Sequence, residues 1–192
     1  VSSSSKYSNA GDYKEIIEWV NIQKKLNKFS IKRIDLQSLD KWELDSSSEI
    51  KHESGGFFQL QGLRVKALTT KSEEWDQPII NQNEIGYLGF ITKKINGVLH
   101  FLTQAKIEPG NIGGIQLSPT LQATKSNCLR LHKGKMPPYL EYFQSATKDN
   151  IIIDTLQSEI GGRFINKRNR NMIISIKEEI DIKDGFKWMT LK

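Results

Sequence analysis

The chain has 192 residues, which is the length of one ordinary domain with a substantial hydrophobic core. Its single cysteine, Cys128, excludes an intrachain disulfide, and no apolar run approaches the length of a membrane-spanning helix. We therefore expect a cytoplasmic protein with no membrane partner. A formal net charge of +6 favours an anionic partner, such as nucleic acid, a nucleotide or a sugar phosphate, without distinguishing among these.

The N-terminal part of the chain predicts a tail and a helix. Residues 1–11 are rich in serine, which predicts a flexible tail before a single domain at residues 12–192. Within residues 12–29 the apolar side chains recur at helical spacing, and Asp12 is suited to cap the helix. The predicted apolar face consists of Ile16, Trp19, Val20, Ile22 and Leu26.

The next part of the chain predicts short strands. Residues 29–36 alternate between polar and apolar side chains as a strand does, and residues 36–44 predict a short turn or helix. Residues 50–68 predict two strands separated by a Gly-Gly pair. Residues 69–78 are polar and predict a loop.

The centre of the chain predicts a β-hairpin. Residues 85–108 contain two alternating apolar runs, and Asn96 and Gly97 between them supply the positive φ angles of a tight turn. The remaining predicted elements are a strand, a short helix beginning near Pro138 and further strand, at residues 113–124, 137–145 and 150–180. Many strands with few helices indicate a mixed sheet of the α+β class.

Polar side chains recur on the second strand of this hairpin and on the strand that follows. Because side chains alternate across a strand, Gln104, Lys106 and Glu108 share one face. The following strand also carries alternating polar residues, which are Gln116, Ser118, Thr120, Gln122 and Thr124. A solvent-exposed sheet face is an ordinary explanation of such alternation. Two adjacent polar strands can instead line a cavity, so these residues are candidate ligand contacts.

A basic cluster lies near the last predicted strands. It consists of Arg163, Lys167, Arg168 and Arg170. Such a cluster suits phosphate binding, although a solvated basic turn explains it equally well. If the segment is a strand, Lys167 and Asn169 face the side opposite to Arg168 and Arg170, so only one of the two sets reaches a single ligand.

Several long motifs resemble those of nucleotide-sugar 2,3-dehydratases, the enzymes that remove the 2-hydroxyl group from 4-keto-6-deoxyhexoses. The similar segments lie between residues 19 and 191 and include IKHESGGFFQLQGLRV, WDQPIINQNEIGYLGF, GVLHFLTQAKIEPGN, QLSPTLQATKSN and LQSEIGGRFINKRNRNM. The resemblance implies a Nudix-like α+β domain, which the family carries as two tandem copies, without the metal-binding glutamate signature of Nudix hydrolases. This chain also lacks that signature, so we expect no metal. Because it resembles the N-terminal copy alone, we expect a homodimer or a second copy of the domain as its partner.

The resemblance implies a reaction in which a dTDP-linked 4-keto sugar loses a proton from C3 and the hydroxyl group from C2, without a cofactor. This reaction requires a base near C3, a donor to the C4 oxygen and an acid for the leaving hydroxide. Glu108, at the end of its strand, is the first candidate for the base, and His52 is the second. An ion pair with Lys106 is the alternative explanation of Glu108. Lys106 itself would hold the C4 oxygen or a phosphate, and Asp76 and Glu84 are weaker candidates.

The nucleotide part of such a substrate needs an aromatic face, an amide and cationic groups. Trp75 together with Gln77 or Gln82 is the candidate site for the base. The basic cluster is the candidate site for the diphosphate, and Arg168 and Arg170 are favoured within it. Further candidate contacts to the substrate are Gln104, Asn111, Gln116, Ser118, Thr120, Gln122, Ser126, Asn127, His132, Arg163 and Lys167.

Two other functions compete with catalysis. A non-catalytic nucleotide-sugar-binding copy, or half of a two-domain dehydratase, would bind the ligand without turnover. A nucleic-acid-binding module would use the basic cluster and would lose affinity steeply with salt. Aromatic residues are not interleaved with that cluster as a stacking platform requires, so we expect no nucleic acid partner.

Overall fold

The computed structural model describes residues 13–68, 73–124, 127 and 136–191. In chain order its elements are α1 (Tyr13–Leu26), the 3-10 helix η1 (Leu36–Ser38), β1 (Trp42–Leu44), β2 (Ile50–His52), β3 (Gln59–Lys66), β4 (Glu74–Asn81), β5 (Gly86–Ile95), β6 (Val98–Ile107), β7 (Ile115–Ser118), β8 (Leu121–Ala123), α3 (Leu140–Gln144), β9 (Ile151–Ser158), β10 (Arg168–Ser175) and β11 (Phe186–Met189). Strands make up most of this regular structure, so the α+β prediction is confirmed.

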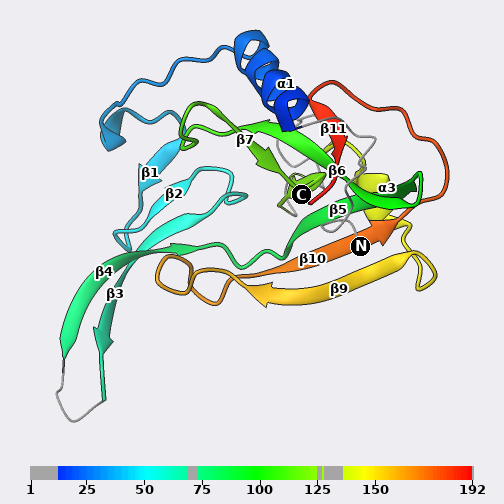
Figure 1. The fold of residues 1–192 in the computed structure, drawn as a ribbon. Helices are drawn as coiled ribbons and strands as arrows, with labels where there is room; N and C mark the ends of the chain where they lie inside the picture. The colour runs from blue at the N-terminus through cyan, green and yellow to red at the C-terminus, as the bar shows by residue number, and fades with distance from the viewer. Residues whose placement is uncertain (1–12, 69–72, 125–126, 128–135, 192) are drawn as a thin grey trace.

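The strands form two sheets (Figure 1). Within the described residues, the smaller sheet has the strand order β1-β2-β3-β4 and is antiparallel. The larger sheet has the order β11-β6-β5-β10-β9, with β7 paired to β6 and β8 paired to β5. Because β10 runs parallel to β5 and antiparallel to β9, the larger sheet is mixed, as the sequence predicts.

The β5–β6 hairpin has the predicted tight turn. Asn96 and Gly97 have φ angles of 48° and 79°, which match the two positive values that a two-residue hairpin turn requires. Next to this turn, residues 92–95 pair with residues 98–101. The local sequence therefore fixes this part of the larger sheet.

Farther from the turn the two hairpin strands separate. There, β5 pairs with β8, whereas β6 pairs with β7. Thr120, between β7 and β8, joins both hairpin strands through its hydroxyl group. This group accepts a hydrogen bond from the Ile91 N–H at 2.9 Å and donates one to the Leu102 carbonyl oxygen. A fork thus opens between the beginning of β5 and the end of β6.

The hydrophobic core lies between the larger sheet and α3. Leu140 and Phe143 of α3 pack in one cluster with Ile91 and Leu102, which are fully buried. Gly89 of β5 allows this close approach, because a Cβ atom there would clash with the Phe143 ring. The core therefore holds β5 and β6 rigidly below the fork.

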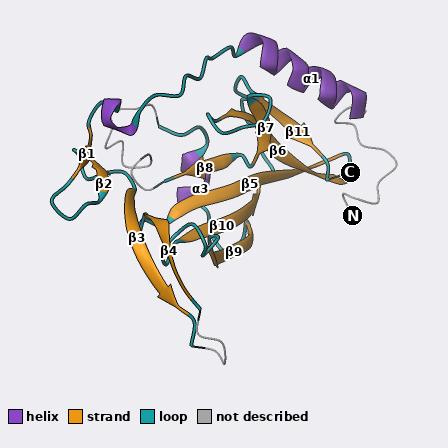
Figure 2. Cartoon of the chain, turned by 90° about the vertical axis from the view of Figure 1, so that its left-hand side faces the viewer, coloured by secondary structure: helices purple, strands orange, loops and turns teal. Residues whose placement is uncertain are grey.

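The β3–β4 hairpin extends away from the rest of the molecule (Figures 1 and 2). Its strands pair continuously from Gln59 opposite Asn81 to Lys66 opposite Glu74. At its base, Ile80 forms an isolated β-bridge with Phe164. The hairpin is connected to the larger sheet mainly through this end.

Some predicted elements are wrong. Residues 27–35 have no regular secondary structure, although residues 29–36 were predicted to be a strand. Alternation favours a strand only where a neighbour offers backbone hydrogen bonds. Residues 74–78, predicted to lie in a loop, belong to β4 instead, because β3 pairs with them and an edge strand tolerates Pro78. The single strand predicted at residues 113–124 is divided into β7 and β8.

The presence of α1 and α3 was predicted correctly, but the apolar face of α1 and the first residue of α3 were not. The helix α1 is confirmed, but Ile22 and Leu26 are 46% and 72% exposed, so its half-buried apolar face is narrower than predicted. The second described α-helix begins at Leu140, so Pro138 precedes it and is not its first residue. In the described part of the chain no helix is long and apolar enough to cross a membrane. The predicted tail and the Asp12 cap lie outside the described residues.

Candidate active site

A cavity of about 270 Å³ lies at the fork. Gly86, Tyr87 and Leu88, the first residues of β5, contribute to its lining. The strand β8 pairs with this part of β5 on one side, and β10 pairs with it on the other. The cavity therefore has one wall from the β6–β8 segment and a second wall from the β9–β10 segment.

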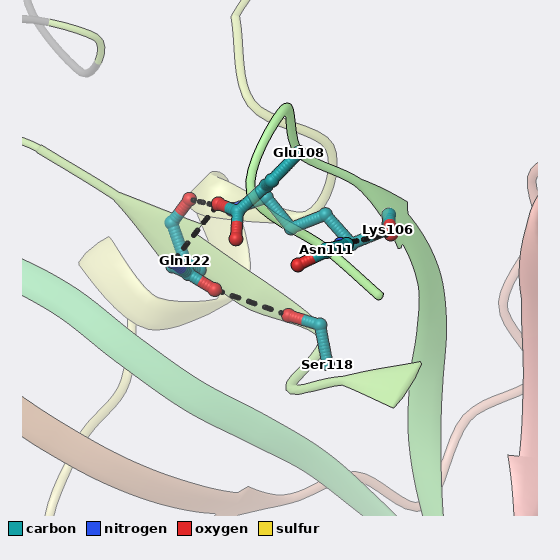
Figure 3. A network of polar contacts seen from close by, with 5 residues as sticks. All are labelled: Lys106, Glu108, Asn111, Ser118 and Gln122. Carbon is teal, nitrogen blue, oxygen red and sulfur yellow. Dashed lines mark hydrogen bonds and ion pairs between the residues drawn. The ribbon is translucent and has the colours of Figure 1, made fainter. Parts of the chain in front are cut away.

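The first wall carries an ion pair that is held by a network of hydrogen bonds (Figure 3). The ammonium group of Lys106 lies 3.1 Å from Oε1 of Glu108. Gln122 of β8 donates to the same carboxylate oxygen at 3.3 Å, and its main-chain carbonyl group accepts a hydrogen bond from Lys106 at 3.5 Å. Ser118 donates to the Gln122 side chain at 3.2 Å. The network fixes the position of a carboxylate that remains 44% exposed.

The chain places Glu108 at the cavity by ending β6 immediately before it. Pro109 cannot donate a backbone hydrogen bond, and with Gly110 it forms a turn after the strand. In this turn the Asn111 N–H donates to the Glu108 carbonyl oxygen at 3.0 Å, and the Asn111 side chain donates to the Lys106 carbonyl oxygen at 3.1 Å. These contacts fix the turn that follows Lys106 and Glu108, both of which line the cavity.

The second wall carries a buried lysine and a carboxylate. Lys167 is 5% exposed, and its ammonium group donates to the main-chain carbonyl oxygen of Glu84. Asn169 donates through its side chain to Glu159 and accepts a hydrogen bond from the Gly86 N–H at 3.1 Å. Burial lowers the pKa of Lys167 below its usual value, and the nearby carboxylates of Glu84 and Glu159 oppose this shift. The second wall therefore presents a desolvated cation.

The two walls together offer groups for proton transfer. Glu108 can accept a proton, while Lys106 and Lys167 can donate hydrogen bonds or a proton. Among the hollows of larger volume are one of about 590 Å³, between α1 and β6, and one of about 490 Å³, on the β3–β4 hairpin. They lack this convergence of two lysines and two carboxylates among their described lining residues. Convergent polar groups are a better indication of a reaction site than volume alone.

Comparison with known proteins shows the family to which the chain belongs. Residues 13–192 match the sequence model of a family described as NDP-hexose 2,3-dehydratase. The chain belongs to this family. The family resemblance inferred from the sequence motifs is thereby confirmed. The match covers nearly the whole chain of this NDP-hexose 2,3-dehydratase family member.

Three curated relatives carry the name dTDP-4-dehydro-6-deoxy-alpha-D-glucopyranose 2,3-dehydratase. The protein of Saccharopolyspora spinosa is 46% identical over 86% of this chain, and that of Amycolatopsis orientalis is 40% identical over 92%. The protein of Streptomyces violaceoruber is 42% identical over 85% of this chain. The aligned parts make up 34%, 39% and 37% of these relatives, so the chain spans little more than a third of their length.

The structure brings several predicted site residues of this dehydratase family member together. The predicted residues that line the cavity are Gln82, Lys106, Glu108, Gln122, Thr124, Asn127 and Lys167. Gln104 lies farther along β6, where it lines the larger hollow beside α1. The prediction that Gln116, Ser118, Thr120, Gln122 and Thr124 share one face of a single strand is wrong. Thr120 is 1% exposed and Ser118 is buried, because the chain turns between β7 and β8, whereas Gln116 is exposed.

The basic cluster divides as strand pleating predicts, but the favoured set lies away from the cavity lining. Lys167 and Asn169 line the cavity. Arg170 forms a two-point ion pair with Asp154 of β9, at 2.8 and 2.6 Å, and its guanidinium group lies over the Tyr87 ring. This contact raises the pKa of Arg170 and lowers the pKa of Asp154. Arg163 and Arg168 are exposed.

Other candidates lie elsewhere in the fold. Trp75 donates to Gln77 at 2.9 Å on the β3–β4 hairpin, and Gln77 donates to the Gly162 carbonyl oxygen at 3.0 Å. His52 belongs to the smaller sheet, where its ring lies 4.5 Å from that of Phe57. The carboxylate of Asp76 is held by Arg64 through two hydrogen bonds of 2.9 Å. Ser126 and His132 lie outside the described residues.

Glu159 and Asn169 are cavity residues that were not among the predicted site residues. Glu159 follows β9 and has no motif of its own, and Asn169 was noted only for its position in the strand. Alternation along the chain places Asn169 on the same side as Lys167, and this pattern could have identified Asn169 as a site residue. Glu159 could not be found in this way, because its hydrogen bond to Asn169 depends on the pairing of β9 with β10.

Proposed function

We propose that this chain carries the site of a nucleotide-sugar 2,3-dehydratase, a hydro-lyase that acts on a dTDP-4-keto-6-deoxyhexose in deoxysugar biosynthesis. Its family and the names of the three relatives support this activity. The observation that carries the proposal is the Lys106–Glu108 pair, in which an ammonium group and a carboxylate 3.1 Å apart line one cavity. These are the two groups that formation of an enolate requires.

In the proposed reaction the hexose ring occupies the cavity with C3 toward Glu108 and the C4 oxygen toward Lys106. The ketone at C4 acidifies the C3 proton, because its removal gives an enolate. Glu108 accepts this proton, and the Lys106 ammonium group stabilises the negative charge that develops on the C4 oxygen. The enolate then re-forms the C4 carbonyl group, a C2–C3 double bond forms, and the C2–O bond breaks.

The thymidine diphosphate part of the substrate is proposed to lie outside the cavity. A volume of about 270 Å³ is smaller than the roughly 300–1,000 Å³ of sites that enclose a drug-sized ligand. The sugar therefore suits the cavity, and the diphosphate suits the rim. Arg163 precedes the cavity residue Phe164 and is exposed, so it is better placed for a phosphate than Arg170, which already pairs with Asp154.

The proposed partner in assembly is a second copy of this domain, either in a homodimer or in a longer protein. β9 is an edge strand of the larger sheet in the described structure, and its Ile152, Ile153 and Leu156 side chains are exposed. An apolar edge of this kind favours association. Sedimentation at micromolar concentration would contradict the homodimer if it showed only a monomer.

The test of the proposed activity compares the wild type with Glu108→Gln, using a dTDP-4-keto-6-deoxyhexose as the substrate. Glutamine keeps the shape of the side chain and removes the proton acceptor, so dehydration should fall about a hundredfold or more while binding changes only a few-fold. The control is Glu18→Gln, which alters an exposed carboxylate of α1 and should have no effect.

Other outcomes of this comparison distinguish the alternatives. A wild-type chain that binds the substrate but neither turns it over nor exchanges its C3 proton would favour a non-catalytic binding domain. The engagement of Glu108 by Lys106 and Gln122 is the observation that favours this second candidate. Equal activity of Glu108→Gln and the wild type would contradict the assignment of the base.

A further inference from the structure

Lys167 is a buried cation at the cavity that has no role in the reaction as proposed so far. In that reaction Glu108 is the base and Lys106 binds the enolate oxygen. It is 5% exposed and lines the cavity on the wall opposite to Lys106 and Glu108, across the first residues of β5. A buried ammonium group carries a large desolvation cost unless hydrogen bonds or charges compensate it. A lysine in this position therefore needs an explanation beyond packing.

The contacts of Lys167 leave donors for a ligand. An ammonium group has three N–H donors, and the hydrogen bond described for it, to the Glu84 carbonyl oxygen, uses one of them. That acceptor belongs to the main chain, so its position depends on the backbone and not on a mobile side chain. The remaining donors can point to a ligand in the cavity that Lys167 lines.

Asn169 and Glu159 hold the backbone at Lys167, which lies immediately before β10. Asn169 bonds to Glu159 on one side and to the Gly86 N–H, at 3.1 Å, on the other. The Glu159 N–H also donates to the Lys167 carbonyl oxygen at 2.9 Å. These bonds join β9, β10 and β5 around the lysine, so Asn169 and Glu159 are positioning residues.

We propose that Lys167 is the catalytic acid that protonates the hydroxyl group leaving from C2, an assignment that rests on the proposed dehydratase activity. A base and an acid on opposite walls match a reaction in which C3 loses a proton and the neighbouring carbon loses an oxygen. Burial lowers the pKa of Lys167, which makes its ammonium group a stronger acid than an exposed lysine.

The proton balance of this assignment closes without a further reactant. Glu108 takes the C3 proton, and the C2–O bond breaks as Lys167 gives a proton to the departing oxygen, so that water leaves and Lys167 becomes neutral. The product is an enol with its hydroxyl group on C3. Return of the Glu108 proton to C2, with transfer of the enol proton to Lys167, gives the 3,4-diketo sugar and restores both residues.

The test compares a substrate that needs an acid with one that does not. The variant Lys167→Met is assayed in the full chain with a dTDP-4-keto-6-deoxyhexose and with its 2-deoxy-2-fluoro analogue, because fluoride leaves without protonation. Dehydration of the natural substrate should fall roughly a hundredfold or more, while fluoride release stays within about threefold of the wild type. Exchange of the C3 proton with deuterated water should continue, since the base is intact.

Two further variants keep the result interpretable. Lys94→Met removes an exposed lysine near the hairpin turn and should leave both reactions unchanged. Lys167→Arg keeps the positive charge but cannot give up a proton, so it should also slow dehydration and spare fluoride release. If Lys167→Met does not fold, the arginine variant decides the question.

Two results would overturn the proposal. Equal losses in dehydration and fluoride release would assign Lys167 to binding or folding, and an unchanged rate of dehydration would remove it from the reaction. Failure of the proposed function would look different, because the wild type itself would then neither exchange the C3 proton nor release water or fluoride.

Discussion

Gly86 forms part of the cavity lining, and its replacement by alanine should damage both stability and ligand binding. An added Cβ atom would lie 2.8 Å from the Ala123 carbonyl oxygen of β8 and 3.1 Å from Oδ1 of Asn169. The first of these atoms belongs to the backbone of a paired strand and cannot move aside easily. The second accepts the Gly86 N–H, so moving it weakens a buried hydrogen bond.

The expected loss of folding stability in Gly86→Ala follows from these two contacts. Forcing one extra carbon into a packed site costs about 1–3 kcal/mol, which in a chain of this size lowers the melting temperature by roughly 2–12 °C. The control is Gly62→Ala on the β3–β4 hairpin, where no heavy atom lies within 4 Å of the added carbon, so stability should change by less than about 0.5 kcal/mol. Urea denaturation of both variants measures the difference. Equal stability of the two variants would refute the close packing of β5 against β8 and Asn169.

Three other changes test the electrostatics of the site and of the sheet. Lys106→Met should reduce both dTDP-sugar affinity and dehydration rate, measured by titration and turnover, because the ammonium group acts before and during enolate formation. Thymidine diphosphate should raise the melting temperature more than adenosine diphosphate does, and equal shifts would indicate recognition of charge alone. Arg170 lowers the pKa of Asp154 below its usual 3.8, so their pairing stabilises the fold above pH 3.8 and this contribution is lost as the pH falls through the folded-state pKa. Asp154→Asn should therefore lower stability at pH 7 by up to about 1 kcal/mol, and its difference from the wild type should shrink in acid denaturation below pH 3.8.

Local patterns predicted the elements that depend on local interactions. The helical spacing of apolar residues identified α1, and Asn96-Gly97 identified the β5–β6 turn, because the same residues that form the pattern also form the contacts. By contrast, β4 was predicted in part to be a loop. Its formation depends on pairing with β3, which outweighs the unfavourable Pro78 in an edge strand.

The residues that line the cavity were also predicted in part. Alternation on β6 and the turn after it were sufficient to single out Lys106 and Glu108. For the basic cluster, alternation separated Lys167 and Asn169 from Arg168 and Arg170 but did not show which pair faces the cavity. That choice depends on the parallel pairing of Asn169 with Gly86, which is distant in sequence. The contact of Arg170 with Asp154 on β9 has the same non-local origin.

The most direct measurement of the central claim is the position of the sugar in a crystal structure of the chain with a bound dTDP-sugar. The ring is predicted to occupy the cavity at the beginning of β5, with C3 about 3–3.5 Å from the Glu108 carboxylate and the C2 oxygen directed toward Lys167. A sugar bound instead in the hollow between α1 and β6, or on the β3–β4 hairpin, would contradict the assignment of this cavity as the site of dehydration.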